Sequence, residues 1–357
     1  MKRTIIVIVD IIIWLLLVLT IPFFILNTFN SIQTSVVSSA SNELIIIFRI
    51  ILFIVTFSIL LVVKHFINKN EVLTLSEIIK YQFKNKKLRS ILITSLLSTI
   101  LLVSVLLINQ RKLYYIPNHS SYSYNKLSKD EDFLKVELKD YENTYVGWLK
   151  NNYEDIPIII YFSGNGHSSA KFFHNSLITE NPIFIEYNFI MLDYPTYGLS
   201  KGTLNEGSNF NMALLTYEYV VNELDYTSDN IHVIGYSLGS GVATYLASKK
   251  AIKNLVLIAP YSSFIDVGNT ILPIFYGPFK NLIKDKYHSI NYASDVESKV
   301  LIVASKKDEV IKFRLSKKLS NSFSNVKFSE FQDLRHNDFY DNYMVQFVIG
   351  VFLTSDE

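Results

Sequence analysis

Cysteine is absent from the 357-residue sequence. Its absence excludes disulfide bonds, metal sites built from thiolates, and a cysteine nucleophile. It does not fix the cellular compartment, because many exported proteins lack disulfides.

Net charge is also small, at +2, but it is unevenly distributed. Residues 1–110 carry ten Lys and Arg against four Asp and Glu, whereas the remainder carries 24 against 28. The C-terminal part has no basic patch, so we expect no nucleic-acid partner. The basic excess lies beside apolar segments, as expected at a membrane surface.

Long apolar runs are confined to the first 110 residues, at Ile5–Leu26, Leu44–Val63 and Ile91–Ile108. Each is close to the roughly 20 residues that cross a bilayer as a helix. Buried core helices are the alternative, but few charges interrupt the runs, which favours membrane spans. A cleaved signal peptide is a second reading of the first run. Its apolar stretch exceeds the usual length of such peptides, so we predict a three-span anchor over residues 1–110.

Charges in the connecting loops predict the orientation of these spans. The first loop, Asn27–Glu43, has no Lys or Arg, whereas Lys64–Ser90 has seven. Basic loops stay in the cytoplasm. The N-terminus is therefore expected to be cytoplasmic and the rest of the chain extracytoplasmic, although Arg111 and Lys112 oppose this orientation.

Residues 111–130 are rich in Tyr, Ser and Asn and are predicted to be a linker, followed by a catalytic domain over residues 131–357. There, short apolar runs alternate with helical patterns, which predicts an α/β fold with a mostly parallel sheet. Such sheets bind ligands at the carboxyl ends of their strands. The expected strands are Phe133–Leu138, Thr144–Lys150, Pro157–Phe162, Phe189–Leu192, Ile231–Ile234, Leu255–Ile258, Val300–Val303 and Val326–Phe331.

A G-x-S-x-G pattern, Gly235-Tyr236-Ser237-Leu238-Gly239, follows one of these strands directly and precedes a helical pattern. In a strand–turn–helix setting this pattern presents a nucleophilic serine, Ser237, on a strained turn. Gly235 and Gly239 are expected because side chains there would clash. The Leu238 backbone N–H, at the helix start, is a candidate oxyanion donor.

A serine nucleophile needs a base that is oriented by an acid, in the chain order Ser, Asp or Glu, His. Asp308 follows the strand Val300–Val303, with Glu309 as the neighbouring alternative. His336 follows the last strand. All three residues come at the ends of strands, so we expect them to meet above the sheet.

The loop after Pro157–Phe162, Ser163-Gly164-Asn165-Gly166-His167, is expected to supply the second oxyanion donor. We assign this donor to the Asn165 backbone N–H, with Gly164 as the alternative. Gly164, His167 and Tyr236 are further candidates for substrate contact. His232 lies within a predicted strand and is interpreted as a core residue.

Four blocks in this order resemble the abhydrolase-domain, lysophospholipase-like branch of the α/β hydrolases. They are Ser163–Gly166, Asp193–Gly202 with Glu206-Gly207, the Ser237 turn, and Arg335–Asp338. The resemblance covers residues 130–352. Ser163 stands where the family has His, and Pro195-Thr196 where it has Arg-Gly. The resemblance implies ester hydrolysis, often of acylglycerols or lysophospholipids, with no metal or other cofactor.

Residues 262–295 form an apolar insertion between two predicted strands. It is either a short cap that lines an acyl pocket or an ordinary packed connection. The sequence therefore predicts a membrane-anchored serine esterase whose substrate is a lipid or another ester. A peptidase or thioesterase on the same fold and a non-enzymatic membrane scaffold remain the alternatives.

Overall fold

The computed structural model describes residues 97, 104–105, 107–119, 121–151, 153, 155–271 and 275–355. The chain divides into two compact units, Met1–Tyr114 and Tyr115–Glu357, and each is described by itself. In the first unit the structure describes one short helix, α5 (Gln110–Tyr114).

The expected spans Ile5–Leu26 and Leu44–Val63 lie outside the described residues, as does most of Ile91–Ile108. Within the part of the chain that is described, we found no helix with the length and apolar character needed to cross a bilayer.

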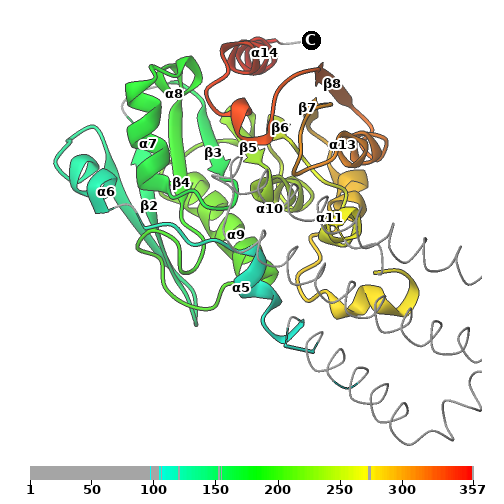
Figure 1. Cartoon of the computed structure of the whole chain (residues 1–357). Coiled ribbons are helices and arrows are strands. Elements are labelled where there is room, and N and C mark those ends of the chain that lie inside the picture. Colours follow the sequence, from blue (N-terminus) through cyan, green and yellow to red (C-terminus); the bar gives the residue numbers. More distant parts are fainter. Residues whose placement is uncertain are drawn as a thin grey trace, which may run out of the picture. The chain divides into compact units, whose positions relative to one another are not determined.

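The second unit is built on an eight-stranded sheet in the order β1-β2-β4-β3-β5-β6-β7-β8 (Figure 1). β2 pairs antiparallel with both β1 and β4, and all the later pairs are parallel. The strands are β1 (Leu134–Lys139), β2 (Thr144–Lys150), β3 (Ile158–Phe162), β4 (Asn188–Leu192), β5 (Ile231–Tyr236), β6 (Asn254–Ile258), β7 (Lys299–Ser305) and β8 (Val326–Phe331).

The central strands form because they are apolar along their whole length. Every residue of β3, β4, β5 and β6 is buried, as expected for parallel strands covered on both faces. The prediction of an α/β fold with a mostly parallel sheet is therefore confirmed.

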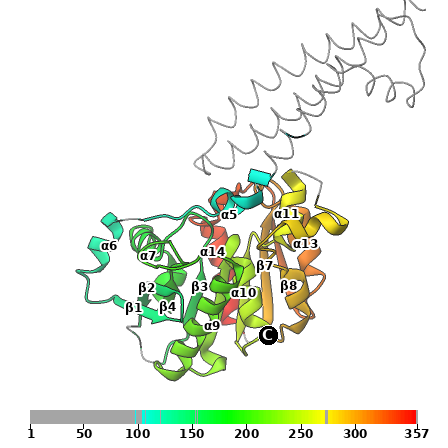
Figure 2. The same ribbon diagram turned by 90° about the horizontal axis from the view of Figure 1, so that it is seen from below.

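Helices cover both faces of the sheet (Figures 1 and 2). One face carries α7 (Ser169–Ile178), α8 (Pro182–Glu186) and α14 (Tyr343–Thr354). The other carries α9 (Glu206–Asn222), α10 (Leu238–Ala247) and α13 (Phe313–Ser320). The N-cap of α9 is hydrogen-bonded, because the Asn205 side chain accepts from the Ser208 N–H.

The segment 111–130, predicted to be a linker, contains a helix and buried side chains. It contains α6 (Ser121–Leu127), in which Leu127 is 1% exposed. Tyr115 is also buried, and its hydroxyl lies 2.7 Å from that of Tyr287. Polar composition concealed these buried side chains, which belong to the domain's core.

The insertion at 262–295 contains α11 (Phe264–Ile271), the 3-10 turns Gly277–Leu282 and Ala293–Asp295, and α12 (Ser289–Tyr292). Its ends are packed: the Tyr287 side chain is fully buried, and the Glu206 carboxylate accepts from the Lys286 and Tyr287 N–H groups. In contrast, two aromatic side chains near its middle are exposed to solvent: Tyr276 and Phe279 are 60% and 59% exposed.

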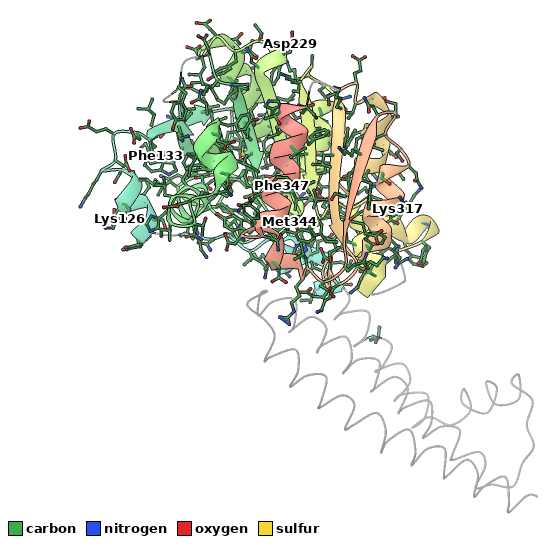
Figure 3. The ribbon with its side chains drawn as sticks, turned by 90° about the horizontal axis from the view of Figure 1, so that it is seen from above. Lys126, Phe133, Asp229, Lys317, Met344 and Phe347 are labelled. Atoms are coloured by element: carbon green, nitrogen blue, oxygen red, sulfur yellow. The ribbon has the colours of Figure 1, made fainter. Side chains whose placement is uncertain are left out.

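The final helix, α14, is apolar on both its inner and outer sides. Val345 and Ile349 are buried against the sheet, whereas Met344 and Phe347 are exposed (Figure 3). This helix follows the turn that carries His336, and its buried face belongs to the hydrophobic core.

Candidate active site

Ser237 lies between β5 and α10 in a backbone conformation that side chains rarely adopt, with φ 50° and ψ −114°. Three hydrogen bonds hold this turn. The Ser237 N–H donates to the Ile258 carbonyl at 2.9 Å, and the Ser240 N–H and Oγ both donate to the Ser237 carbonyl, at 3.0 and 2.6 Å. A strained residue that is fixed by its surroundings is typical of a functional site.

The two glycines of the pattern are required by close packing. A Cβ on Gly239 would lie 2.0 Å from the Phe162 carbonyl oxygen. A Cβ on Gly235 would lie 2.5 Å from the Gly239 carbonyl oxygen and 2.6 Å from the Ala243 Cβ. Because neither residue has a side chain, the turn can bring α10 close to β3 and β5.

Ser237, His336 and Asp308 form one chain of hydrogen bonds. The Ser237 Oγ lies 2.9 Å from His336 Nε2, and His336 Nδ1 lies 2.8 Å from Asp308 Oδ2. All three residues are buried, with exposures of 7%, 6% and 4%. The arrangement can hold the histidine with a proton on Nδ1 and leave Nε2 to accept the serine proton.

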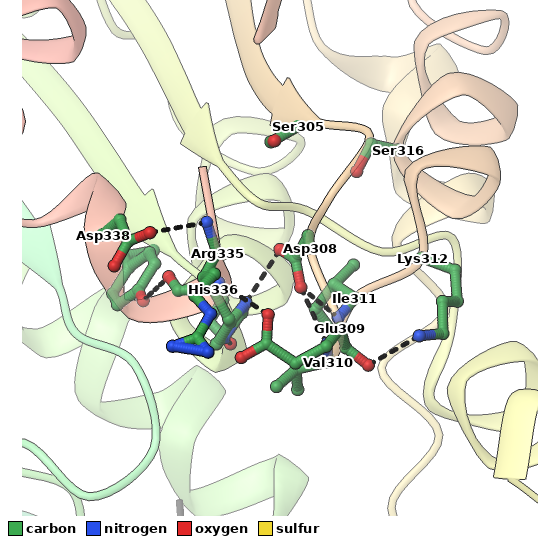
Figure 4. A network of polar contacts seen from close by, with 12 residues as sticks. Ser305, Asp308, Glu309, Val310, Ile311, Lys312, Ser316, Arg335, His336 and Asp338 are labelled. Atoms are coloured by element: carbon green, nitrogen blue, oxygen red, sulfur yellow. Dashed lines mark hydrogen bonds and ion pairs between the residues drawn. The ribbon is translucent and has the colours of Figure 1, made fainter. Parts of the chain in front are cut away.

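Asp308 is fixed on its other oxygen, where Oδ1 accepts from the Val310 and Ile311 N–H groups at 2.9 and 2.8 Å. Glu309, the alternative acid, is exposed, and its Oε2 accepts from the His336 backbone N–H at 3.2 Å (Figure 4). The geometry thus places Asp308, and not Glu309, against the imidazole ring.

Tyr236 was expected to contact the substrate, but its side chain is buried and contacts His336. Its side chain is 3% exposed, and its hydroxyl donates to the His336 carbonyl at 2.6 Å. Its ring stacks on the imidazole with centroids 5.5 Å apart. Tyr236 therefore contacts His336 both through its hydroxyl and through its ring.

The candidate oxyanion loop passes directly beside Ser237. A Cβ on Gly164 would lie 3.5 Å from the Ser237 Cβ and 2.9 Å from the Tyr236 ring. The Asn165 side chain is directed elsewhere, since its Oδ1 accepts from the Tyr197 hydroxyl and the Ile116 N–H. Backbone N–H groups of this loop are candidate oxyanion donors, together with that of Leu238 at the start of α10.

His167 lies next to this site, half-buried, with its ring centroid 6.0 Å from that of Tyr236. Burial, with Lys171 and His336 nearby, lowers the pKa of His167 to about 4. Its imidazole is therefore neutral near pH 7. His232 is 1% exposed within β5, in agreement with its interpretation as a core residue.

The sheet order, the serine turn and the histidine after the last strand together identify the architecture. The domain has the α/β-hydrolase fold. A family model described as the alpha/beta hydrolase fold matches residues 157–287.

The chain is also similar to several known proteins, and a solved structure among them shares its fold. The uncharacterized protein Rv2307c of Mycobacterium tuberculosis is 31% identical over 130 residues, which are 36% of this chain and 46% of that protein. The match thus spans about half of that relative. The lysophosphatidylserine lipase ABHD12 of Danio rerio is 25% identical over 236 residues, covering 58% of this chain and 60% of that protein. The Pyrococcus furiosus esterase Pf2001 superposes with a TM-score of 0.54 at 18% identity, covering 67% of this chain and 97% of that one.

A cavity of about 40 Å³ lies within the α/β-hydrolase domain, between the sheet and the helices α8 and α14. None of its lining residues comes from the described parts of the insertion, 262–271 and 275–295. It is bordered by residues that include Tyr161, Phe172, Phe184, Tyr236, Phe339 and Ile349. This cavity therefore does not support the cap interpretation of the insertion.

Asp193, which opens the second sequence block of the α/β-hydrolase domain, is buried behind the site. Its two oxygens bond to the N–H and the hydroxyl of Ser169 at 2.5 and 2.7 Å. Burial raises the pKa of Asp193 from 3.8 to about 7. Because the folded-state pKa is the higher one, the folded state favours the protonated carboxyl, and stability is lost as pH rises from about 4 to 7.

Asp193→Asn should therefore be more stable than the wild type at pH 8, by roughly 2–4 kcal/mol, and equally stable at pH 4. The amide keeps an acceptor for the Ser169 N–H and never ionises. Denaturant unfolding in detergent at the two pH values would measure this. A variant less stable than the wild type at pH 8 would show that the carboxylate is ionised and well accommodated.

Proposed function

We propose that this protein is a membrane-anchored serine hydrolase that cleaves carboxylic esters of the acylglycerol or lysophospholipid kind. The observation that carries the proposal is the hydrogen-bonded chain from Ser237 through His336 to Asp308 at a strained strand–helix turn. The named activity of the zebrafish relative, a lysophosphatidylserine lipase, supports a lysophospholipid substrate.

The reaction would proceed in two halves. In the first, the Ser237 Oγ attacks the ester carbonyl while His336 Nε2 takes its proton and returns it to the leaving alcohol, which yields an acyl-enzyme. In the second, His336 takes a proton from water, the resulting hydroxide attacks the acyl group, and the proton goes back to Ser237. Asp308 orients the ring and stabilises the imidazolium.

The oxyanion formed in each half would be held by the backbone N–H groups of Leu238 and Asn165. The Leu238 N–H belongs to the first turn of α10, where the helix dipole favours negative charge. Such fixed donors stabilise the transition state more than the ground state.

Substrate class is tested with a panel of lysophospholipids, monoacylglycerols, p-nitrophenyl esters, thioesters and aminoacyl-anilides on the full-length protein in detergent. We expect hydrolysis of the lipid esters that Ser237→Ala abolishes. Faster turnover of anilides would indicate a peptidase instead. A wild-type protein inert to every substrate and to a fluorophosphonate probe would indicate a non-enzymatic scaffold.

We further propose that the N-terminus is cytoplasmic, that three spans cross the membrane, and that the hydrolase domain is extracytoplasmic. The support is the excess of Lys and Arg in the second loop of the N-terminal region. A reporter enzyme fused after Glu357 should be active only outside the cytoplasm. Activity of a cytoplasm-specific reporter at the same position would refute this orientation.

A further inference from the structure

The hydrolase unit begins with a short segment, Tyr115–His119, that lies against the candidate oxyanion loop; we call it the lead-in segment. The Ile116 N–H donates to Asn165 Oδ1 at 2.9 Å, with the Tyr197 hydroxyl oxygen 3.0 Å away. The Asn118 Nδ2 donates to the Gly166 carbonyl at 2.9 Å. The lead-in segment therefore holds two consecutive residues of the loop.

Tyr197 lies at the centre of these contacts. Its side chain is fully buried, and its hydroxyl donates to Asn165 Oδ1 at 2.6 Å while it accepts from the Ile116 N–H. Burial raises the pKa of Tyr197 above its ordinary value, so the hydroxyl keeps the proton that it donates. The next residue, Gly198, donates its N–H to the Asn118 carbonyl at 2.9 Å, which ties the lead-in segment to the same turn.

The other end of the loop is held by the same sequence block. The Tyr194 hydroxyl, which is buried, donates to the Ser163 carbonyl at 2.9 Å. Thr196 and Gly198 have positive φ values of 69° and 51°, so the chain turns tightly between and after the two tyrosines. The block Asp193–Gly202 thus has a defined task that the catalytic residues alone do not explain: its tyrosines hold the loop at Ser163 and at Asn165.

We propose that the lead-in segment and the Tyr197 hydroxyl position the oxyanion loop Ser163–Gly166 against Ser237. The inference rests on the serine-hydrolase function proposed above. An oxyanion donor is effective only when it is fixed before charge develops on the substrate. A loop with two glycines has wide backbone freedom and depends on outside contacts for its shape. Ile116, Asn118 and Tyr197 act through the loop and are positioning residues.

The lead-in segment lies close in sequence to the predicted membrane anchor. The lead-in segment starts seven residues after Ile108, where the third predicted span ends. The chain that leaves this span therefore enters the hydrolase unit as part of the support for the oxyanion loop.

The test uses full-length Tyr197→Phe and Asn118→Ala in detergent, with a p-nitrophenyl ester and a trifluoromethyl ketone inhibitor. Tyr197→Phe should lower kcat about tenfold and leave KM nearly unchanged, a smaller effect than the roughly 100-fold loss expected for a missing oxyanion donor. Affinity for the ketone, which forms an oxyanion on Ser237, should fall by a similar factor. Asn118→Ala should show the same pattern with a loss of about threefold.

The matched control is Tyr217→Phe, which removes a hydroxyl that donates to the Ala251 carbonyl at 2.8 Å, away from the site. It should keep kcat and ketone affinity even where its melting temperature falls. Wild-type kcat and ketone affinity in Tyr197→Phe would overturn the proposal. If that variant does not fold, Asn118→Ala decides the matter, because Asn118 is only partly buried. A wild-type protein without esterase activity would instead refute the proposed function.

Discussion

Ser237→Ala is expected to abolish ester hydrolysis, with a fall in kcat of roughly 10⁶-fold, and to eliminate covalent labelling by a fluorophosphonate. The reason is that the Ser237 Oγ is the atom within 2.9 Å of His336 Nε2, at a turn that fixes its position. Without this oxygen no acyl-enzyme can form, and only the oxyanion donors and substrate binding remain. Active-site labelling, resolved by gel, and ester kinetics would measure the loss.

Ser168→Ala is the matched control for this experiment. Ser168 follows His167 in the chain and is fully buried, and its hydroxyl has no hydrogen-bond partner among the residues that the structure describes. This substitution also removes one serine hydroxyl, but it leaves the hydrogen bonds from Ser237 through His336 to Asp308 intact. Labelling and kcat should therefore stay near the wild-type values. Labelling that persists in Ser237→Ala would show that another residue is the nucleophile and would refute the mechanism.

Asp308→Asn is expected to lower kcat by about 10⁴-fold while the fold is kept. The amide oxygen can still accept from the Val310 and Ile311 N–H groups, so the turn after β7 stays in place. The amide nitrogen would then face His336 Nδ1, where it donates instead of accepting. The imidazole must present an unprotonated Nδ1 to it, and Nε2 can no longer accept the proton of Ser237.

Glu309→Gln tests which of the two candidate carboxyl groups, Asp308 or Glu309, orients His336. Glu309 contacts the His336 backbone N–H and not its ring, and a glutamine oxygen can accept the same bond. We expect kcat to change by less than about threefold, since neither the tautomer nor the orientation of the ring depends on it. A large loss in Glu309→Gln with near-normal Asp308→Asn would reverse the assignment. Steady-state kinetics at one pH, with melting temperatures, would distinguish the outcomes.

Much of the architecture could be predicted from the sequence because local patterns determine it. The predicted bounds of β2 and β8 are those that the structure has, since turn residues flank both segments. The turn at Ser237 was recognisable because its two glycines follow a buried strand and precede a helix. The antiparallel opening pair and the parallel remainder follow from short connections in the first case and helical crossovers in the second.

The supporting contacts could not be predicted, because they join residues distant in sequence. Nothing local to Tyr236 shows that its hydroxyl reaches the carbonyl of His336, 100 residues later. The resemblance of Asp193–Gly202 to a family motif indicated that Tyr194 and Tyr197 matter, but not that they contact the loop at Ser163 and Asn165. The polar composition of residues 111–130 likewise concealed a segment that lies against Asn165.

The sequence by itself determined the order of the strands along the chain, the serine on its tight turn, and the two places from which an acid and a base could come. These features depend on periodicity and on residues that are adjacent in the chain. Only the tertiary structure placed Asp308, and not Glu309, against the His336 ring, engaged Asn165 Oδ1 with Tyr197 and Ile116, and joined the lead-in segment to the candidate oxyanion loop. Each of these depends on where a side chain points after the sheet has formed, and a hydrogen bond is sensitive to such differences of about an ångström.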